Sequence, residues 1–193
     1  MPAIRSQLNP RAETHLLAVS MTGVKMGDRV AFVGCAHGGR LAAIASKVGL
    51  SGRAVAVVPD DRTAAVTRKG AEEAGVLVEI EVSPPTALPL ENRAIDLAVV
   101  DDTAGMLAMI PAADRVAAIR ELVRVLRPGG RVIFIGAGPV SGLARLVTRA
   151  PAAASLTASG DVNPALASNG FSIVRTLAER EGLIFVEGIK PRT

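Results

Sequence analysis

A strand-like apolar run that ends in a glycine-rich turn most constrains what this chain can fold into. Residues 30–39 are Val-Ala-Phe-Val-Gly-Cys-Ala-His-Gly-Gly, and apolar residues at helical spacing begin directly after them. Small residues let backbone N–H groups come close to a ligand, and the N-terminus of the following helix carries a partial positive charge. This turn therefore predicts a nucleotide-binding loop between a strand and a helix.

Strand-like and helical segments alternate along most of the chain. Apolar runs predict strands at 29–33, 54–58, 76–82, 95–100, 131–135, 171–177 and 183–189, and helical spacing predicts helices near 16–23, 41–48, 64–74 and 114–126. Near-continuous apolar strands joined by helices indicate a mainly parallel sheet that is covered on both faces. The last two strands, separated by residues 178–182, predict a closing antiparallel hairpin.

The length and composition fit one domain. A chain of 193 residues with 49% hydrophobic content can bury one sizeable core, and it is too short for two ordinary enzyme domains. We expect residues 1–27 to form an N-terminal helix and lead-in, and residues 171–190 to form the hairpin. Residues 136–170 are expected to be a variable connector, with a helix around 141–148. Their composition suits either a flap over a ligand or a plain linker, and we favour the linker.

Composition also limits the partners. No apolar stretch reaches the roughly 18 residues of a bilayer span, and the first residues lack the apolar core of a secretory signal, so we expect a cytoplasmic protein with no membrane partner. One cysteine and two histidines predict no metal site. The net charge of +4 is modest and the chain has no Trp or Tyr, so nucleic-acid binding is not expected.

In this order the elements resemble a class I S-adenosylmethionine-dependent methyltransferase of the small bacterial type. The resemblance covers nearly the whole chain, and its most specific pieces are Gly27-Asp28-Arg29-Val30, Leu88-Pro89-Leu90 ahead of Ile95-Asp96-Leu97, the Leu126-Arg127-Pro128-Gly129-Gly130 junction and the terminal hairpin. It implies an α/β, Rossmann-like, doubly wound sheet of seven strands, mostly parallel with an antiparallel C-terminal hairpin. It also implies S-adenosylmethionine as the cofactor.

The resemblance assigns the cofactor to the glycine-rich turn and to the ends of the next two strands. Gly34 and Gly38 match loop glycines of the family, Ala36 stands where the family has a third, and Cys35 and His37 lie between them. The three acids that hold the cofactor in the family align with Phe32, Val58 and Pro84 here, although Pro85 or Ser83 could occupy the third place.

Loss of these acids would weaken cofactor binding. Each charge-assisted hydrogen bond contributes about 1.5–3 kcal/mol, so three lost partners amount to several powers of ten in affinity. Asp60 or Asp61, just beyond Val58, could reach the ribose instead; the alternative is that this acidic pair caps the helix before Thr63.

Asp101 and Asp102 are expected to follow the fourth strand, where open α/β sheets place their ligands. The resemblance implies a catalytic or substrate-orienting role for them, and a turn that caps the next helix is the alternative. Cys35 and His37 are not expected to form a nucleophile pair: we interpret Cys35 as a small buried thiol, and we expect His15 over the same cleft as His37. Arg120, Arg124 and Arg127 are interpreted as the solvated face of their helix.

Three functions remain open from the sequence. The first is a methyltransferase with an atypical cofactor pocket that acts on a small molecule. The second is a methyltransferase-like protein that has lost catalysis and serves as a binding or interaction module, with a homodimer as one form. The third is an NAD(P)-binding oxidoreductase, because Gly34, Ala36 and Gly39 also fit a G-x-A-x-x-G loop.

Overall fold

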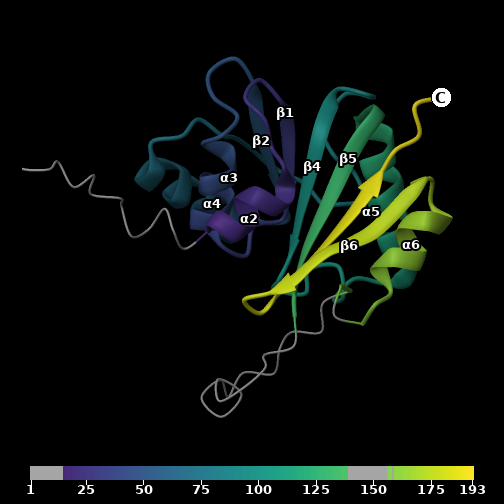
Figure 1. The fold of residues 1–193 in the computed structure, drawn as a ribbon. Helices are drawn as coiled ribbons and strands as arrows, with labels where there is room; N and C mark the ends of the chain where they lie inside the picture. The colour runs from purple at the N-terminus through teal and green to yellow at the C-terminus, as the bar shows by residue number, and fades with distance from the viewer. Residues whose placement is uncertain (1–14, 139–155, 158) are drawn as a thin grey trace, which may run out of the picture.

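A seven-stranded sheet with helices on both faces forms the body of the molecule (Figure 1). The structure, a computed structural model, describes residues 15–138, 156–157 and 159–193. The strands are β1 (Arg29–Val33), β2 (Arg53–Val58), β3 (Glu79–Val82), β4 (Ile95–Asp102), β5 (Leu126–Ala137), β6 (Ile173–Arg180) and β7 (Leu183–Ile189). The helices are α2 (Leu16–Thr22), α3 (Gly38–Ala45), α4 (Asp61–Ala74), α5 (Ala112–Val125) and α6 (Val162–Ser168).

The strand order is β3-β2-β1-β4-β5-β7-β6. Strands β1 to β5 pair in parallel, whereas β7 runs antiparallel to both β5 and β6. The predicted fold class, a mostly parallel Rossmann-like sheet with an antiparallel C-terminal hairpin, is confirmed.

Two apolar layers cover the sheet. Successive strand residues point to opposite faces, so Ala31 and Val33 pack in the layer under α5 and α6, while Val30 and Phe32 pack in the layer under α2 and α3. All four side chains are buried. This two-sided burial explains why the strands are near-continuous apolar runs in the sequence.

Several element bounds differ from the prediction. Strand β4 continues through Asp102, because Asp101 and Asp102 still pair with β5, so these aspartates end the strand rather than follow it. Strand β5 begins at Leu126, which pairs with Ile95, and the Pro-Gly-Gly segment lies inside this irregular first part of the strand. Strand β3 starts only at Glu79.

The C-terminal hairpin also has a tighter turn than expected. Strand β6 continues to Arg180, so the connection to β7 is Glu181-Gly182 rather than residues 178–182. Both residues have a positive φ (56° and 71°), as in the two-residue turns that match the twist of paired strands. Helix α6 lies inside the predicted connector 136–170, and the helix expected at 141–148 falls outside the described residues.

A buried carboxylate joins the hairpin to the rest of the sheet. Glu187 in β7 is 3% exposed and forms ion pairs with Arg131 in β5 and Arg175 in β6. Arg131 also donates to the carbonyl oxygens of Thr22 and Gly23 at the end of α2. One acidic side chain thereby connects three strands and, through Arg131, the N-terminal helix. None of the helices in the described ranges is long and apolar enough to cross a bilayer.

Candidate functional site

The loop between β1 and α3 lies at the carboxyl ends of the parallel strands, where this class of sheet binds ligands. Gly34 begins the loop with a φ of +75°, and its N–H donates to the carbonyl oxygen of Val57 at 2.9 Å. An added Cβ at Gly34 would lie 3.0 Å from the sulfur of Met106 and 3.1 Å from the carbonyl oxygen of Asp101. The positive φ therefore favours glycine here, and an added Cβ would also be tight against both neighbours.

Asp101, at the end of β4, is the centre of the polar contacts around this loop. Its Oδ2 accepts from the Ala36 N–H at 3.3 Å, and both of its carboxylate oxygens accept from Arg40 Nη1, at 3.0 and 3.1 Å. Thr103 donates to Oδ1 through its hydroxyl (2.6 Å) and its N–H (3.2 Å). The carboxylate predicted to act on substrate is thus held by partners within the chain.

Asp102 is fully buried and tied to backbone. Its two oxygens accept from the N–H groups of Leu107 (2.8 Å) and Leu156 (2.9 Å). Burial raises the pKa of this carboxyl, although the two N–H donors oppose the shift. Asp102 therefore fixes the segment after β4 against residue 156. A catalytic role for Asp101 and Asp102 stays a prediction, and both side chains have structural partners.

The positions at which the family carries its acids have no carboxylate in this fold. Phe32 and Val58 point into the apolar layer under α2 and α3, where both are buried, and Pro84 is exposed after β3. None of these three side chains offers a carboxylate to a ligand.

Asp60 is the N-cap of α4. Its Oδ1 accepts from the Thr63 N–H at 2.7 Å, and this contact lowers the pKa of the exposed carboxyl. The capping alternative therefore describes Asp60 in this structure. Asp61 is the first residue of α4 and is exposed beside the end of β2. Within this acidic pair, Asp61 and the carboxylate oxygen of Asp60 that does not cap the helix are the groups available to contact a ligand.

Gly38, the last of the matched loop glycines, packs against a helix. An added Cβ at Gly38 would lie 2.5 Å from the carbonyl oxygen of Val66 and 3.2 Å from the Cα of Gly70, both in α4. The exposed His37 is the N-cap of α3, and its side chain makes no capping hydrogen bond. The start of α3 is thus anchored by packing on α4 and lacks a side-chain cap.

His15 and His37 meet edge to face over this end of α3, with ring centroids 5.0 Å apart. Burial lowers the pKa of His15, and the neighbouring His37 and Arg40 lower it further. His15 therefore lies beside the predicted loop, as expected. Cys35 is buried and burial raises its pKa, which agrees with the interpretation of a small buried thiol.

Arg124 has a role that the sequence analysis missed. Its guanidinium donates to the carbonyl oxygens of Leu88 and Leu90, to Asn92 Oδ1 and to Glu121. It is not simply part of a solvated face, and Arg127 does not lie on the helix at all, because α5 ends at Val125; Arg127 lies in β5 and pairs with Asp96, whereas Arg120 is exposed as predicted. The Leu-Pro-Leu segment is thus fixed to α5 by Arg124 together with Glu121, which accepts from the Leu88 N–H at 2.8 Å, and no sequence spacing signals these contacts.

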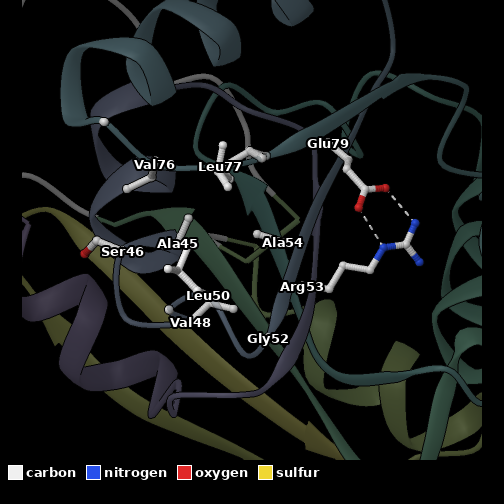
Figure 2. A pocket seen from close by; sticks show the side chains of 13 residues that line it. Ala45, Ser46, Val48, Leu50, Gly52, Arg53, Ala54, Val76, Leu77 and Glu79 are labelled. Atoms are coloured by element: carbon white, nitrogen blue, oxygen red, sulfur yellow. Dashed lines mark hydrogen bonds and ion pairs between the residues drawn. The ribbon is translucent and has the colours of Figure 1, made fainter.

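A surface hollow of about 500 Å³ lies at the other end of the sheet, where β2 and β3 begin. Figure 2 shows Val48, Leu50 and Leu77 around it and two hydrogen bonds between Arg53 and Glu79 at its rim. Because β2 and β3 are parallel, this hollow lies at the end opposite to Gly34 and Asp101. It is separate from the residues predicted to hold a cofactor.

The comparisons with known proteins agree on the type of domain. A model of the family described as "Methyltransferase domain" matches residues 30–130, slightly more than half of the chain. An uncharacterized 37.1 kDa protein in transposon Tn4556 of Streptomyces fradiae is 33% identical over 108 residues, which are 56% of this chain and 30% of that protein. The chain therefore spans about a third of the length of this curated relative.

Solved structures share the fold at low sequence identity. An S-adenosylmethionine-dependent methyltransferase from Aquifex aeolicus superposes with a TM-score of 0.72 at 18% identity, covering 92% of this chain and 88% of its own. The [4+2]-cyclase SpnF superposes with a TM-score of 0.69 at 16% identity, covering 94% and 81%. The family match and the methyltransferase neighbours, the one from Aquifex aeolicus and SibL, support S-adenosylmethionine as the cofactor.

Proposed function

The chain belongs to the methyltransferase-domain family, and from this premise we propose that it is an S-adenosylmethionine-dependent methyltransferase that acts on a small molecule through an atypical cofactor pocket. The supporting observation is the loop from Gly34 to His37, which approaches the carboxyl end of β4 closely and leads into a helix with no side-chain cap. The N-terminus of such a helix, with its partial positive charge, suits a ligand carboxylate.

The backbone of the glycine-rich loop fits the cofactor, but the residues that align with the family's acids are not acidic in this chain. We assign the amino-acid end of the cofactor to the loop of Gly34, Cys35, Ala36 and His37, whose shape Gly38 supports from behind through its packing on α4. When bound, S-adenosylmethionine supplies an electrophilic methyl group.

The nucleoside end of the cofactor is assigned to the ends of β2 and β3. Pro84 is exposed there and offers apolar contact, whereas Val58 is buried and only marks the end of β2; we assign the ribose to Asp61, since Asp60 caps its helix. Phe32 fills the place of the first acid and leaves the loop without a carboxylate from its own strand. The pocket is atypical in this respect: its polar contacts come mainly from backbone.

A binding or interaction protein without catalysis is the second candidate. The observation that favours it is that all three positions aligned with the family's acids carry apolar side chains. Fold alone does not decide between the two, because one scaffold supports different chemistries; the name of the cyclase neighbour illustrates this. A homodimer stays a prediction for either candidate.

Calorimetric titration with S-adenosylmethionine and with S-adenosylhomocysteine tests the proposal, on protein stripped of carried-over ligand. Calorimetry suits a chain without Trp or Tyr. We expect micromolar binding of at least one of the two. No heat up to millimolar ligand contradicts the methyltransferase and favours the second candidate, whereas tight binding of NAD(H) or NADP(H) instead favours an oxidoreductase.

A matched pair of glycine variants tests whether the ligand binds at this loop. Gly34→Ala and Gly75→Ala both put a side chain on a left-handed residue (φ +75° and +65°), but only the first adds a Cβ against Met106 and Asp101; around Gly75 nothing lies within 4 Å. We expect both variants to lose stability and only Gly34→Ala to lose affinity. Equal affinity in both would remove the loop from the binding site.

A further inference from the structure

The loop between β1 and α3 is held by a carboxylate that comes from the neighbouring strand. In the sheet Phe32 of β1 lies beside Val99 of β4, and Val33 lies beside Val100. Asp101 is two residues beyond Val99, so it points to the same face as Phe32. On this face β1 therefore carries Phe32, and the carboxylate near the loop is Asp101 of the neighbouring strand β4.

Asp101 is bonded to both ends of this loop region. It accepts from the N–H of Ala36, in the middle of the loop, and from the guanidinium of Arg40, in the first turn of α3. The Arg40 and Asp101 side chains are only 12% and 10% exposed. A carboxylate this buried requires partners, because the loss of hydration is costly unless hydrogen bonds and an opposite charge replace it.

Thr103 completes the arrangement. Its hydroxyl lies 2.6 Å from Asp101 Oδ1 and accepts from Arg40 Nη1 at 3.1 Å. Asp101 thus accepts five hydrogen bonds, one from Ala36, two from Arg40 and two from Thr103. These bonds fix the Asp101 side chain, which in turn holds the loop. Such a closed polar cluster sets the direction of the remaining loop N–H groups, which is what a backbone-dominated ligand site depends on.

We propose that Asp101 is the positioning residue of the cofactor loop: from β4 it supplies the carboxylate that β1 lacks, and Arg40 is the counter-charge that keeps it aimed at Ala36. The inference rests on the proposed function, since it concerns the same ligand. It assigns Asp101 to holding the loop rather than to accepting a proton from substrate. The sign of the charge on β4 matters in this arrangement, not merely the presence of an ion pair.

Three variants separate this role from a general structural one. Asp101→Asn keeps the shape and removes the charge. The double variant Arg40→Asp/Asp101→Arg keeps an opposite-charge pair but places a cation against the Ala36 N–H. The matched control is Arg53→Glu/Glu79→Arg, which exchanges the charges of an ion pair at the opposite end of the same sheet.

Two measurements are made on each protein, the affinity for S-adenosylhomocysteine and the amide hydrogen exchange of Ala36. For Asp101→Asn we expect about a tenfold or greater loss of affinity, the size of one charge-assisted hydrogen bond, together with faster exchange. The Arg40/Asp101 exchange should not restore affinity, and the Arg53/Glu79 exchange should leave both values unchanged. Wild-type affinity in the Arg40/Asp101 exchange, or an unaltered Asp101→Asn protein, overturns the inference.

The two proposals fail in different ways. If the wild-type protein binds neither form of the cofactor, the proposed function fails, and the exchange rate of Ala36 in the unliganded proteins still decides the role of Asp101. Faster exchange in Asp101→Asn then supports loop positioning, and unchanged exchange contradicts it. Asp101→Asn is nearly isosteric, so it decides the question by itself if the double variant does not fold.

Discussion

Gly38 and Gly70 touch backbone to backbone where the first turn of α3 crosses α4. An added Cβ at Gly70 would lie within 2.7 Å of the Cα, the carbonyl carbon and the carbonyl oxygen of Gly38, a separation that real side chains do not reach. The resemblance assigns Gly38 to a ligand loop, and in the structure Gly38 also packs closely against α4. This contact sets the position of α3, and through it the position of Arg40.

Substitution at this contact should destabilise the protein. For Gly70→Ala we expect a loss of about 1–3 kcal/mol in the free energy of unfolding, because the clash is with backbone and outweighs the gain of about 1 kcal/mol in helix propensity. Urea denaturation measures it. The exposed Glu72→Ala on the same helix is the control and should stay within about 0.5 kcal/mol of wild type. A Gly70→Ala protein as stable as that control would contradict the contact.

Asp60 should act through its helix rather than through a ligand. Its lowered pKa means that the ionised cap stabilises the folded protein above the ordinary carboxyl pKa of about 4, and that this stability is lost as the pH falls through the lowered value. Thermal unfolding should show a lower Tm for Asp60→Ala and little change for Asp60→Asn, because asparagine caps equally well. If Asp60→Asn keeps its Tm but loses affinity for S-adenosylhomocysteine, Asp60 contacts the ligand as well.

Arg124 should be more important for stability than its place on α5 suggests. Arg124→Met removes the donors to Leu88, Leu90 and Asn92, and we expect a loss of about 1–3 kcal/mol, since these bonds carry the charge of one guanidinium. Chemical denaturation provides the value. Arg120→Met, at an exposed position of the same helix, serves as the control and should change little. Equal effects at the two positions would argue against the role assigned to Arg124.

Asp102 should give the stability a pH dependence of opposite sign to that of Asp60. Its pKa is raised, so the folded state holds this proton more tightly than the unfolded state does. The stability of wild type relative to Asp102→Asn should therefore fall as the pH rises from about 4 through the raised pKa, and stay constant above it. Unfolding free energies of both proteins at a series of pH values check this, and a difference that grows with pH would be the opposite result.

The sequence predicts the fold correctly where the hydrophobic periodicity and the positions of glycine and proline indicate the same element bounds. Strand β7 has the predicted bounds, and α4 ends where Gly75 takes a left-handed conformation that stops the helix. The errors lie at strand ends such as Asp101 and Asp102, because a polar residue can still pair with a neighbouring strand while its side chain turns to other partners.

The candidate site was less accessible to prediction than the fold. Asp101 and Arg40 are 61 residues apart, and Arg124 bonds to carbonyls more than 30 residues earlier. Spacing along a helix or strand tells which face a residue occupies, but not what a long polar side chain reaches after the chain has folded. The resemblance located the loop and the missing acids, whereas only the structure gives the partner of each remaining charge.

The buried Glu187 restricts the register in which β7 pairs with its neighbouring strands. Its neighbours along β7, Val186 and Gly188, face the opposite side of the sheet, where Val186 packs in the layer under α5 and α6. If β7 paired one residue out of step, Glu187 would enter that layer without Arg131 or Arg175, at a cost that no gain in contact would recover. A single acid thus opposes every alignment of β7 that is shifted by an odd number of residues.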